Sequence, residues 1–131
     1  MKLLLPRGWR RPRGYSNGVS ACGRLIFTAG VIGWDQEERL VSETLPCQFE
    51  QVLKNILAIL AEDGAGPEHV VRTTWYIIDR DDYVYHLKEL GAAWRAHFGS
   101  HYPAMAVVEV SALIEPGAKV EIEATAVVPE P

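Results

Sequence analysis

Cysteine and long apolar runs are scarce in this chain of 131 residues. The two cysteines, Cys22 and Cys47, are too few for a disulfide framework and share no C-x-x-C spacing, so we expect reduced thiols in a cytoplasmic protein. No apolar run approaches the roughly 18 residues that cross a bilayer, and no membrane association is expected. The opening "MKLLLPRGW" has three leucines before Pro6, too few for the apolar core of a signal peptide.

The motifs that hold phosphates, metals or nucleophilic serines are also missing. The "GAG" at 64–66 follows a helix pattern and lacks the spacing of a phosphate-binding loop, and no serine lies in a G-x-S-x-G elbow. His97 and His101 are four residues apart, but Gly99 ends the helix between them and no third ligand is near. We therefore predict neither a metal site nor a cofactor.

Charge is modest in total and uneven along the chain. A net charge of −4, with 48% hydrophobic and 23% charged residues, is typical of one globular domain and disfavours a general nucleic-acid binder. Residues 1–14 form a basic segment that contains "RGWRRPRG", and residues 15–131 form the domain. The segment is either a solvated terminus broken by proline and glycine, which we favour, or an arm that binds phosphate or nucleic acid.

Hydrophobic periodicity predicts two helices and five strands. The helices span 45–63, capped by Thr44, and run from Asp81 or Asp82 to 98. The strands are a hairpin over 19–29 that turns at residues 22–24, followed by 69–79, 104–113 and 120–128. The expected helix stripes are Phe49, Val52, Ile56, Ile59 and Leu60, then Tyr83, Leu87, Leu90, Trp94 and Phe98.

This element order predicts an α+β domain in which two helices cover one face of a mixed sheet. The expected apolar face of the strand at 69–79 is Val71, Thr73, Trp75 and Ile77. We expect Trp75 in the core under the helices. The segment "AMAVVEV" is apolar on both faces apart from Glu109, so it needs a second covering layer. Either the sheet closes on itself or, as we favour, the uncovered face packs against another subunit.

Two carboxylates alternate with apolar residues on the last strand. Glu121 and Glu123 point to one side, and Val120, Ile122 and Ala124 to the other. They are either solvated glutamates at an exposed edge, or one of them lies in a half-buried cleft and acts as a general base or water-positioning group. The sequence leaves both interpretations open.

Several segments together resemble the RidA (YjgF) family. They are "GYSNGV", "RLIFTAGVIG", "QFEQVLKNILAILAEDGAGPEHVVRTTWYIID", "YPAMAVVEVSAL" and "AKVEIEATAVV", in order from Tyr15 to Val128. The resemblance implies a chorismate-mutase-like fold assembled as a homotrimer, with small-molecule clefts between subunits. It also implies hydrolysis of enamines and imines, typically 2-aminoacrylate and its imine tautomer, to a 2-oxo acid and ammonia.

The resemblance assigns roles to individual residues. Tyr15 matches a tyrosine whose hydroxyl bonds the substrate, and Glu121 matches a glutamate that positions the attacking water. Backbone groups near Gly30 and Val107 would hold the polar end of the ligand. The predicted ligand-binding residues are Ala29, Gly30, Val31, Trp34, Met105, Ala106 and Val107. Val31 stands where relatives often have glutamine, and with Trp34 it implies a more apolar rim.

Met105 is the main departure from the family pattern. The family has an arginine in a "PAR" tripeptide that clamps the substrate carboxylate, whereas this chain has "PAM". A thioether carries no charge and is only a weak acceptor. Arg24, Arg72 or Arg13 could supply a charge from elsewhere, and strand position favours Arg72.

Three functions follow from these features. The first is a RidA-like hydrolase with altered substrate choice, in which Tyr15 and Glu121 orient ligand and water. The second is a binding or regulatory trimer that keeps the cleft without the chemistry. The third, RNA cleavage, has been ascribed to some relatives and has only the basic terminus in its favour, so nucleic acid is not an expected partner.

Overall fold

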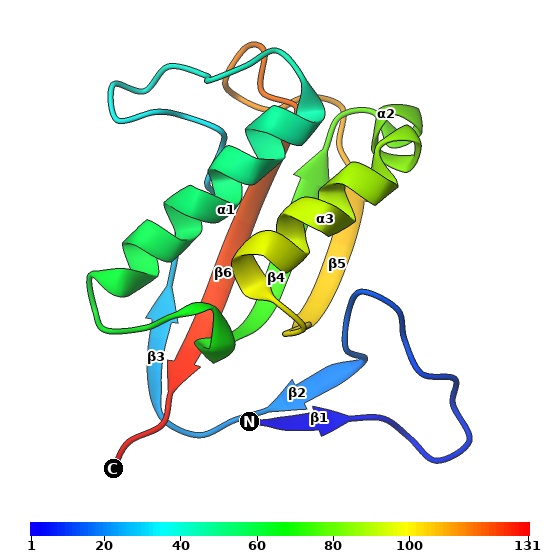
Figure 1. The fold of residues 1–131 in the computed structure, drawn as a ribbon, viewed down its shortest axis with the longest axis vertical. Coiled ribbons are helices and arrows are strands. Elements are labelled where there is room, and N and C mark those ends of the chain that lie inside the picture. Colours follow the sequence, from blue (N-terminus) through cyan, green and yellow to red (C-terminus); the bar gives the residue numbers. More distant parts are fainter.

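A four-stranded sheet carries two long helices on one of its faces (Figure 1). The computed structural model describes residues 1–131. The strand order is β3-β6-β4-β5, in which β4 and β5 run parallel and the other neighbours run antiparallel. The strands are β3 (Arg24–Phe27), β4 (Val70–Ile77), β5 (Ala104–Glu109) and β6 (Val120–Val128). The predicted α+β class and mixed sheet are confirmed, although β5 ends four residues before its predicted end at 113.

The helices follow from apolar stripes at helical spacing. They are α1 (Leu45–Ala61), the 3-10 turn η1 (Pro67–His69), α2 (Arg80–Tyr85) and α3 (Leu87–Phe98). Three α-helices are therefore present where we predicted two. Asp79, not Asp81 or Asp82, caps the second one, because its carboxylate accepts hydrogen bonds from both of their backbone N–H groups. At His86 the chain leaves α2 and enters α3.

A row of aromatic rings in contact lies in the core between the sheet and the helices. Phe49 lies 4.9 Å from Trp75, Trp75 lies 5.7 Å from Trp94, and Trp94 stacks on Phe98 at 4.0 Å between ring centroids. Trp75 is only 6% exposed, so its predicted place under the helices is confirmed. Burial of each large apolar side chain of this kind stabilises the fold by about 1.5–3 kcal/mol.

Some predicted core positions are wrong. A register shift between Val70 and Arg72 breaks the alternation of β4, so Val70 enters the core and Val71 does not. Ile59 and Leu87 lie on the predicted helix stripes but are exposed and do not belong to the core. The remaining members of both stripes are buried or pack against the core.

The predicted hairpin at 19–29 is also wrong. β2 (Gly18–Ser20) pairs with β1 (Lys2–Leu4), and β3 pairs with β6 at the opposite end of the chain. Gly23, with φ of 148°, lies against the Val128 carbonyl, where a side chain would clash. Glycine at this position therefore lets β3 begin close beside the end of β6. The basic terminus is exposed apart from half-buried Pro12, yet its first residues form a strand.

The second face of the sheet has no covering layer in the single chain. Leu25 and Phe27 on β3 are 58% and 67% exposed, and Val108 on β5 is 41% exposed. The second layer that we expected for β5 is therefore absent from one chain, and oligomerisation remains a prediction. No helix in the structure is long and apolar enough to span a membrane.

Candidate functional site

A cavity of about 700 Å³ lies between α1, the segment 29–36 and β6. Glu121 lines it from β6 and is half-buried. Its carboxylate rests on Gly30, where a Cβ would lie 2.8 Å from the Glu121 Cδ and 2.9 Å from Oε2. The absence of a side chain at position 30 therefore makes room for the acid. Glu121 forms neither an ion pair nor a side-chain hydrogen bond within the chain, so both of its oxygens are free to accept.

A bulge beside Glu121 leaves two backbone donors free. The Thr28 N–H donates to the Ala124 carbonyl at 2.9 Å, and the Val31 N–H donates to the Ile122 carbonyl at 2.8 Å. One extra residue on the first strand separates these two pairs, which is the mark of a β-bulge. The N–H groups of Ala29 and Gly30, inside the bulge, donate no hydrogen bond within the chain. The residues that carry these two donors, Ala29 and Gly30, line the same cavity as the Glu121 carboxylate.

Side chains of α1 hold the wall of this cavity in place. The Asn55 amide donates to the carbonyls of Ile32 at 3.2 Å and Trp34 at 2.8 Å, and the Gln51 amide donates to Asn55 at 2.9 Å. The indole Nε1 of Trp34 is buried without a hydrogen-bond partner. Sequence reasoning missed Asn55 and Gln51, whose only signal is their i, i+4 spacing on the polar side of a helix.

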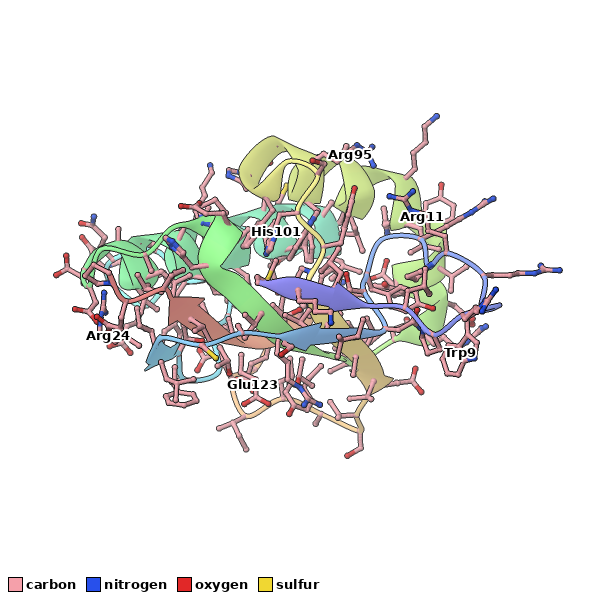
Figure 2. All side chains as sticks on the ribbon, turned by 90° about the horizontal axis from the view of Figure 1, so that it is seen from below. Trp9, Arg11, Arg24, Arg95, His101 and Glu123 are labelled. Carbon is pink, nitrogen blue, oxygen red and sulfur yellow. The ribbon has the colours of Figure 1, made fainter.

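The two glutamates of β6 have different surroundings. Both lie on the same side of β6, as predicted, and Figure 2 shows Glu123 on the face away from the helices. Glu123 is exposed and accepts a hydrogen bond from the Tyr76 hydroxyl at 2.8 Å. That hydrogen bond is the main reason why the pKa of Tyr76 is raised, with burial and the charges of Glu123 and Glu121 adding to it. Glu121 has no such partner and is the carboxylate available to a ligand.

The other predicted site residues lie elsewhere in the chain. Tyr15, Met105 and Ala106 line a separate cavity of about 510 Å³, together with Arg72. Tyr15 is 39% exposed, and the Ser16 N–H next to it donates to the Pro103 carbonyl at 3.0 Å, which holds this segment along β5. Val107 lines neither cavity and packs against the core.

The predicted site thus falls into two groups within one chain. The Glu121 cavity contains Ala29, Gly30, Val31 and Trp34. The Tyr15 cavity contains Met105 and Ala106. Within one chain, the residues of each group lie together, but the two groups lie in separate cavities.

The three candidate replacement arginines have different positions. Arg24 is paired with Asp63 and lies 3.9 Å from Glu130, at the far edge of the sheet (Figure 2). Arg72 lines the Tyr15 cavity. Arg13 lines a third, smaller cavity that also contains Met105.

The fold and the Glu121 cavity define a small α+β domain with a ligand-sized hollow beside a bulged strand. The chain belongs to the RidA (YjgF) family, since the family model for Endoribonuclease L-PSP matches residues 10–128. It is similar to the 2-iminobutanoate/2-iminopropanoate deaminase of Salmonella typhimurium, with 34% identity over 116 residues and 86% of each chain covered. The deaminase of the same name from Homo sapiens is 34% identical over 114 residues, which cover 86% of this chain and 79% of the human one.

A solved structure supports the same assignment. The Rid-family protein YyfB from Yersinia pestis superimposes with a TM-score of 0.86 at 31% identity, covering 97% of this chain and 98% of that one. The agreement extends over nearly the full length of both proteins, so the fold of the whole domain is shared.

Proposed function

We propose that this protein hydrolyses enamines or imines and releases ammonia. The observation that carries the proposal is the free carboxylate of Glu121 beside the two unpaired N–H groups of Ala29 and Gly30. The relatives named as iminobutanoate/iminopropanoate deaminases support the same reaction class. An alternative, a ligand-binding trimer without catalysis, is favoured by Met105, which the family resemblance places where a substrate-clamping arginine is expected.

Imine hydrolysis requires the protein only to position a water molecule and to move protons. Water adds to the carbon of the C=N bond, a proton moves to nitrogen, and the C–N bond then breaks to leave a carbonyl and ammonia. Glu121 would orient the water and accept its proton, while the free N–H groups would bind an oxygen of the substrate. The Tyr15 hydroxyl would hydrogen-bond the substrate from the opposite wall.

This arrangement requires a second copy of the chain, because Glu121 and Tyr15 line different cavities. We propose a homotrimer in which the Glu121 cavity of one subunit faces the Tyr15 cavity of the next. The exposed apolar residues Leu25, Phe27 and Val108 on the open sheet face support an interface there. A monomeric mass in light scattering at micromolar concentration would exclude this assembly.

Substrate choice would differ from that of arginine-bearing relatives. Loss of a charge-assisted hydrogen bond to a carboxylate costs about 1.5–3 kcal/mol, which is roughly one to two powers of ten in affinity. We therefore expect weaker binding of the smallest acidic substrates and a preference for substrates with a larger apolar part.

The experiment measures ammonia release from 2-aminoacrylate that is generated in the assay, and it compares the wild-type protein with a variant at Glu121. The wild-type protein should exceed the buffer rate, and Glu121→Gln should abolish the excess. Glu123→Gln is the matched control, because it removes the same charge on the same strand face, at a carboxylate that accepts a hydrogen bond from Tyr76 and does not line the Glu121 cavity.

The hydrolase and the binding trimer predict different results in this assay. Equal rates for wild type and Glu121→Gln would remove the assigned role of Glu121. No rate above buffer with any small imine, combined with thermal stabilisation by neutral aromatic compounds, would favour the binding trimer.

A further inference from the structure

Residues 5–14 lie between β1 and β2 and form a loop, here called the arm, that extends away from the sheet (Figure 1). The arm contains no acidic residue and four arginines, which are Arg7, Arg10, Arg11 and Arg13. All four are exposed, and none forms an ion pair or a side-chain hydrogen bond within the chain. The arm therefore carries positive charge that a single chain does not neutralise.

A defined turn holds Trp9 in solvent within this arm. The Trp9 N–H donates to the Pro6 carbonyl at 3.1 Å, and Gly8 has a φ of 88°, as a type II turn requires at its third residue. Trp9 is 61% exposed, and Figure 2 shows it at the same end of the molecule as Arg11. A large aromatic side chain presented in this way is typical of a contact with a partner.

Both ends of the arm are attached to the rest of the domain. Before it, β1 pairs with β2, and after it the Ser16 N–H donates to the Pro103 carbonyl at 3.0 Å. The position of Trp9 and the arginines is thus set by the fold on both sides, unlike that of a free terminal tail.

The lining of the Glu121 cavity has the opposite charge. Three of its residues are acidic, namely Asp35, Glu115 and Glu121, and its one cation, Lys54, already lies 3.6 Å from Glu50. Asp35 accepts hydrogen bonds only from backbone N–H groups, and Glu115 and Glu121 have no side-chain partner. The cavity therefore has carboxylates to offer to a cationic surface.

Apolar side chains lie among these carboxylates. Trp34, Ile59 and Ile114 line the same cavity, and Ile114 is fully exposed in the single chain. An apolar surface with acidic groups complements an arm that combines Trp9 with arginines, both in hydrophobicity and in charge.

The arm and the Glu121 cavity lie at opposite edges of the sheet. The arm leads to Ser16, which bridges to Ala104 on the edge strand β5, whereas the cavity adjoins Val31, beyond the end of the other edge strand, β3. The two complementary surfaces of one chain are thus separated by the width of the sheet. A second copy of the chain can bring them together.

We infer that the arm of each subunit covers the Glu121 cavity of the next, with Trp9 against its apolar residues and the arginines facing Glu115 and Asp35. The partner that the arm fits is thus a second copy of this chain. The inference rests on the proposed function, because the proposed trimer sets the Tyr15 cavity against the Glu121 cavity and the arm ends directly before Tyr15. The site is then incomplete in one chain, and its neighbour supplies an aromatic cover.

The first test follows the exposure of Trp9 with acrylamide, a neutral quencher of tryptophan fluorescence. Trp75 and Trp94 are buried and Trp34 is half-buried, so the difference between wild type and Trp9→Phe reports on Trp9. Quenching of Trp9 should fall as the protein concentration rises and light scattering shows assembly. A Trp9 that stays equally accessible in an assembled trimer would overturn the inference.

The second test reverses the charges on both sides of the contact. The double variant Arg10→Glu/Arg11→Glu should raise the dissociation concentration of the trimer at least about tenfold. Glu115→Arg should also weaken assembly alone, but in the double variant it should restore assembly to within about threefold of wild type. Additive losses in the triple variant would contradict a contact between the arm and this cavity.

Lys88→Glu is the matched control for net charge. Lys88 is exposed on α3, lines none of the described cavities and has no ion-pair partner. Its reversal should leave assembly within about twofold of wild type. A loss as large as that of the arm variant would assign the effect to net charge and overturn the inference.

Failure of the arm contact and failure of the proposed function have different signatures. A trimer with Glu121-dependent ammonia release that ignores the arm substitutions removes the contact and leaves the enzyme. Assembly that depends on the arm and on Glu115, without turnover of any imine, supports the contact and removes the hydrolase. A protein that stays monomeric at every concentration removes both the trimer and the contact.

Discussion

The two faces of the sheet differ in what covers them and in what they carry. The face under α1 and α3 holds Trp75, Val120 and Ile122, all within the buried core. The opposite face exposes Phe27 and carries the two glutamates of β6. Ile122 and Glu121 are adjacent in sequence and point to opposite sides because side chains alternate along a strand. One strand thus contributes both to the stability of the fold and to the candidate chemistry.

The largest expected effect contrasts two phenylalanines on the two faces. Phe49→Ala should lower the free energy of unfolding by about 3–5 kcal/mol, because it opens a cavity among Trp75 and its neighbours. Phe27→Ala removes an exposed side chain and should act on association instead, so its effect should depend on protein concentration. Urea denaturation at several protein concentrations measures both. Equal losses of unfolding free energy in the two variants, independent of protein concentration, would contradict the proposed difference between the two faces of the sheet.

The next effect concerns the contact between Gly30 and Glu121. Gly30→Ala should displace the carboxylate and reduce ammonia release roughly 100-fold. The unfolding midpoint should change little, because Gly30 is exposed and its φ is ordinary. In a Glu121→Gln background the same substitution should have almost no further effect on turnover, since it acts through the missing acid. Additive losses in the double variant would show that Gly30 acts in another way.

The smallest effect concerns Tyr76 and Glu123 on the open face. Their hydrogen bond raises the pKa of Tyr76 above the ordinary value of 10.0. The contribution of this contact to stability is therefore complete below pH 10.0 and is lost as pH rises through the raised pKa of Tyr76. Glu123→Gln should lower that pKa more than Glu121→Gln does. Ultraviolet titration of tyrosinate, with Tyr76→Phe to assign the signal, distinguishes the two.

Sequence predicted the parts of the fold that local periodicity determines. The long stripe of α1 and the alternation of β6 identified those elements, and the same alternation predicted that Glu121 and Glu123 share one side of the strand. The partner of β3 did not follow, because it depends on residues about a hundred positions later in the chain. The split of one predicted helix at His86 did not follow either, because the apolar stripe continues from Tyr83 in α2 to Leu87 in α3 across the break.

The candidate site shows the same limit. The family resemblance pointed to Glu121 and Gly30, and the structure places their side chain and backbone in contact. The family resemblance could not indicate that Tyr15 lies in a different cavity of the chain from Glu121. Nor could it indicate that Arg13 and Arg95 line one cavity together with Met105. Those relations arise from the path of the N-terminal segment along β5, which no periodic pattern encodes.

The most direct test of the account is mixing of two inactive variants. Glu121→Gln and Tyr15→Phe should each be defective alone, since each damages one wall of every cleft. When equal amounts are unfolded, mixed and refolded together, clefts that combine an intact wall from each subunit should restore roughly a quarter of the wild-type ammonia release. Ammonia release no higher than the average of the two separate variants would contradict a cleft shared between subunits.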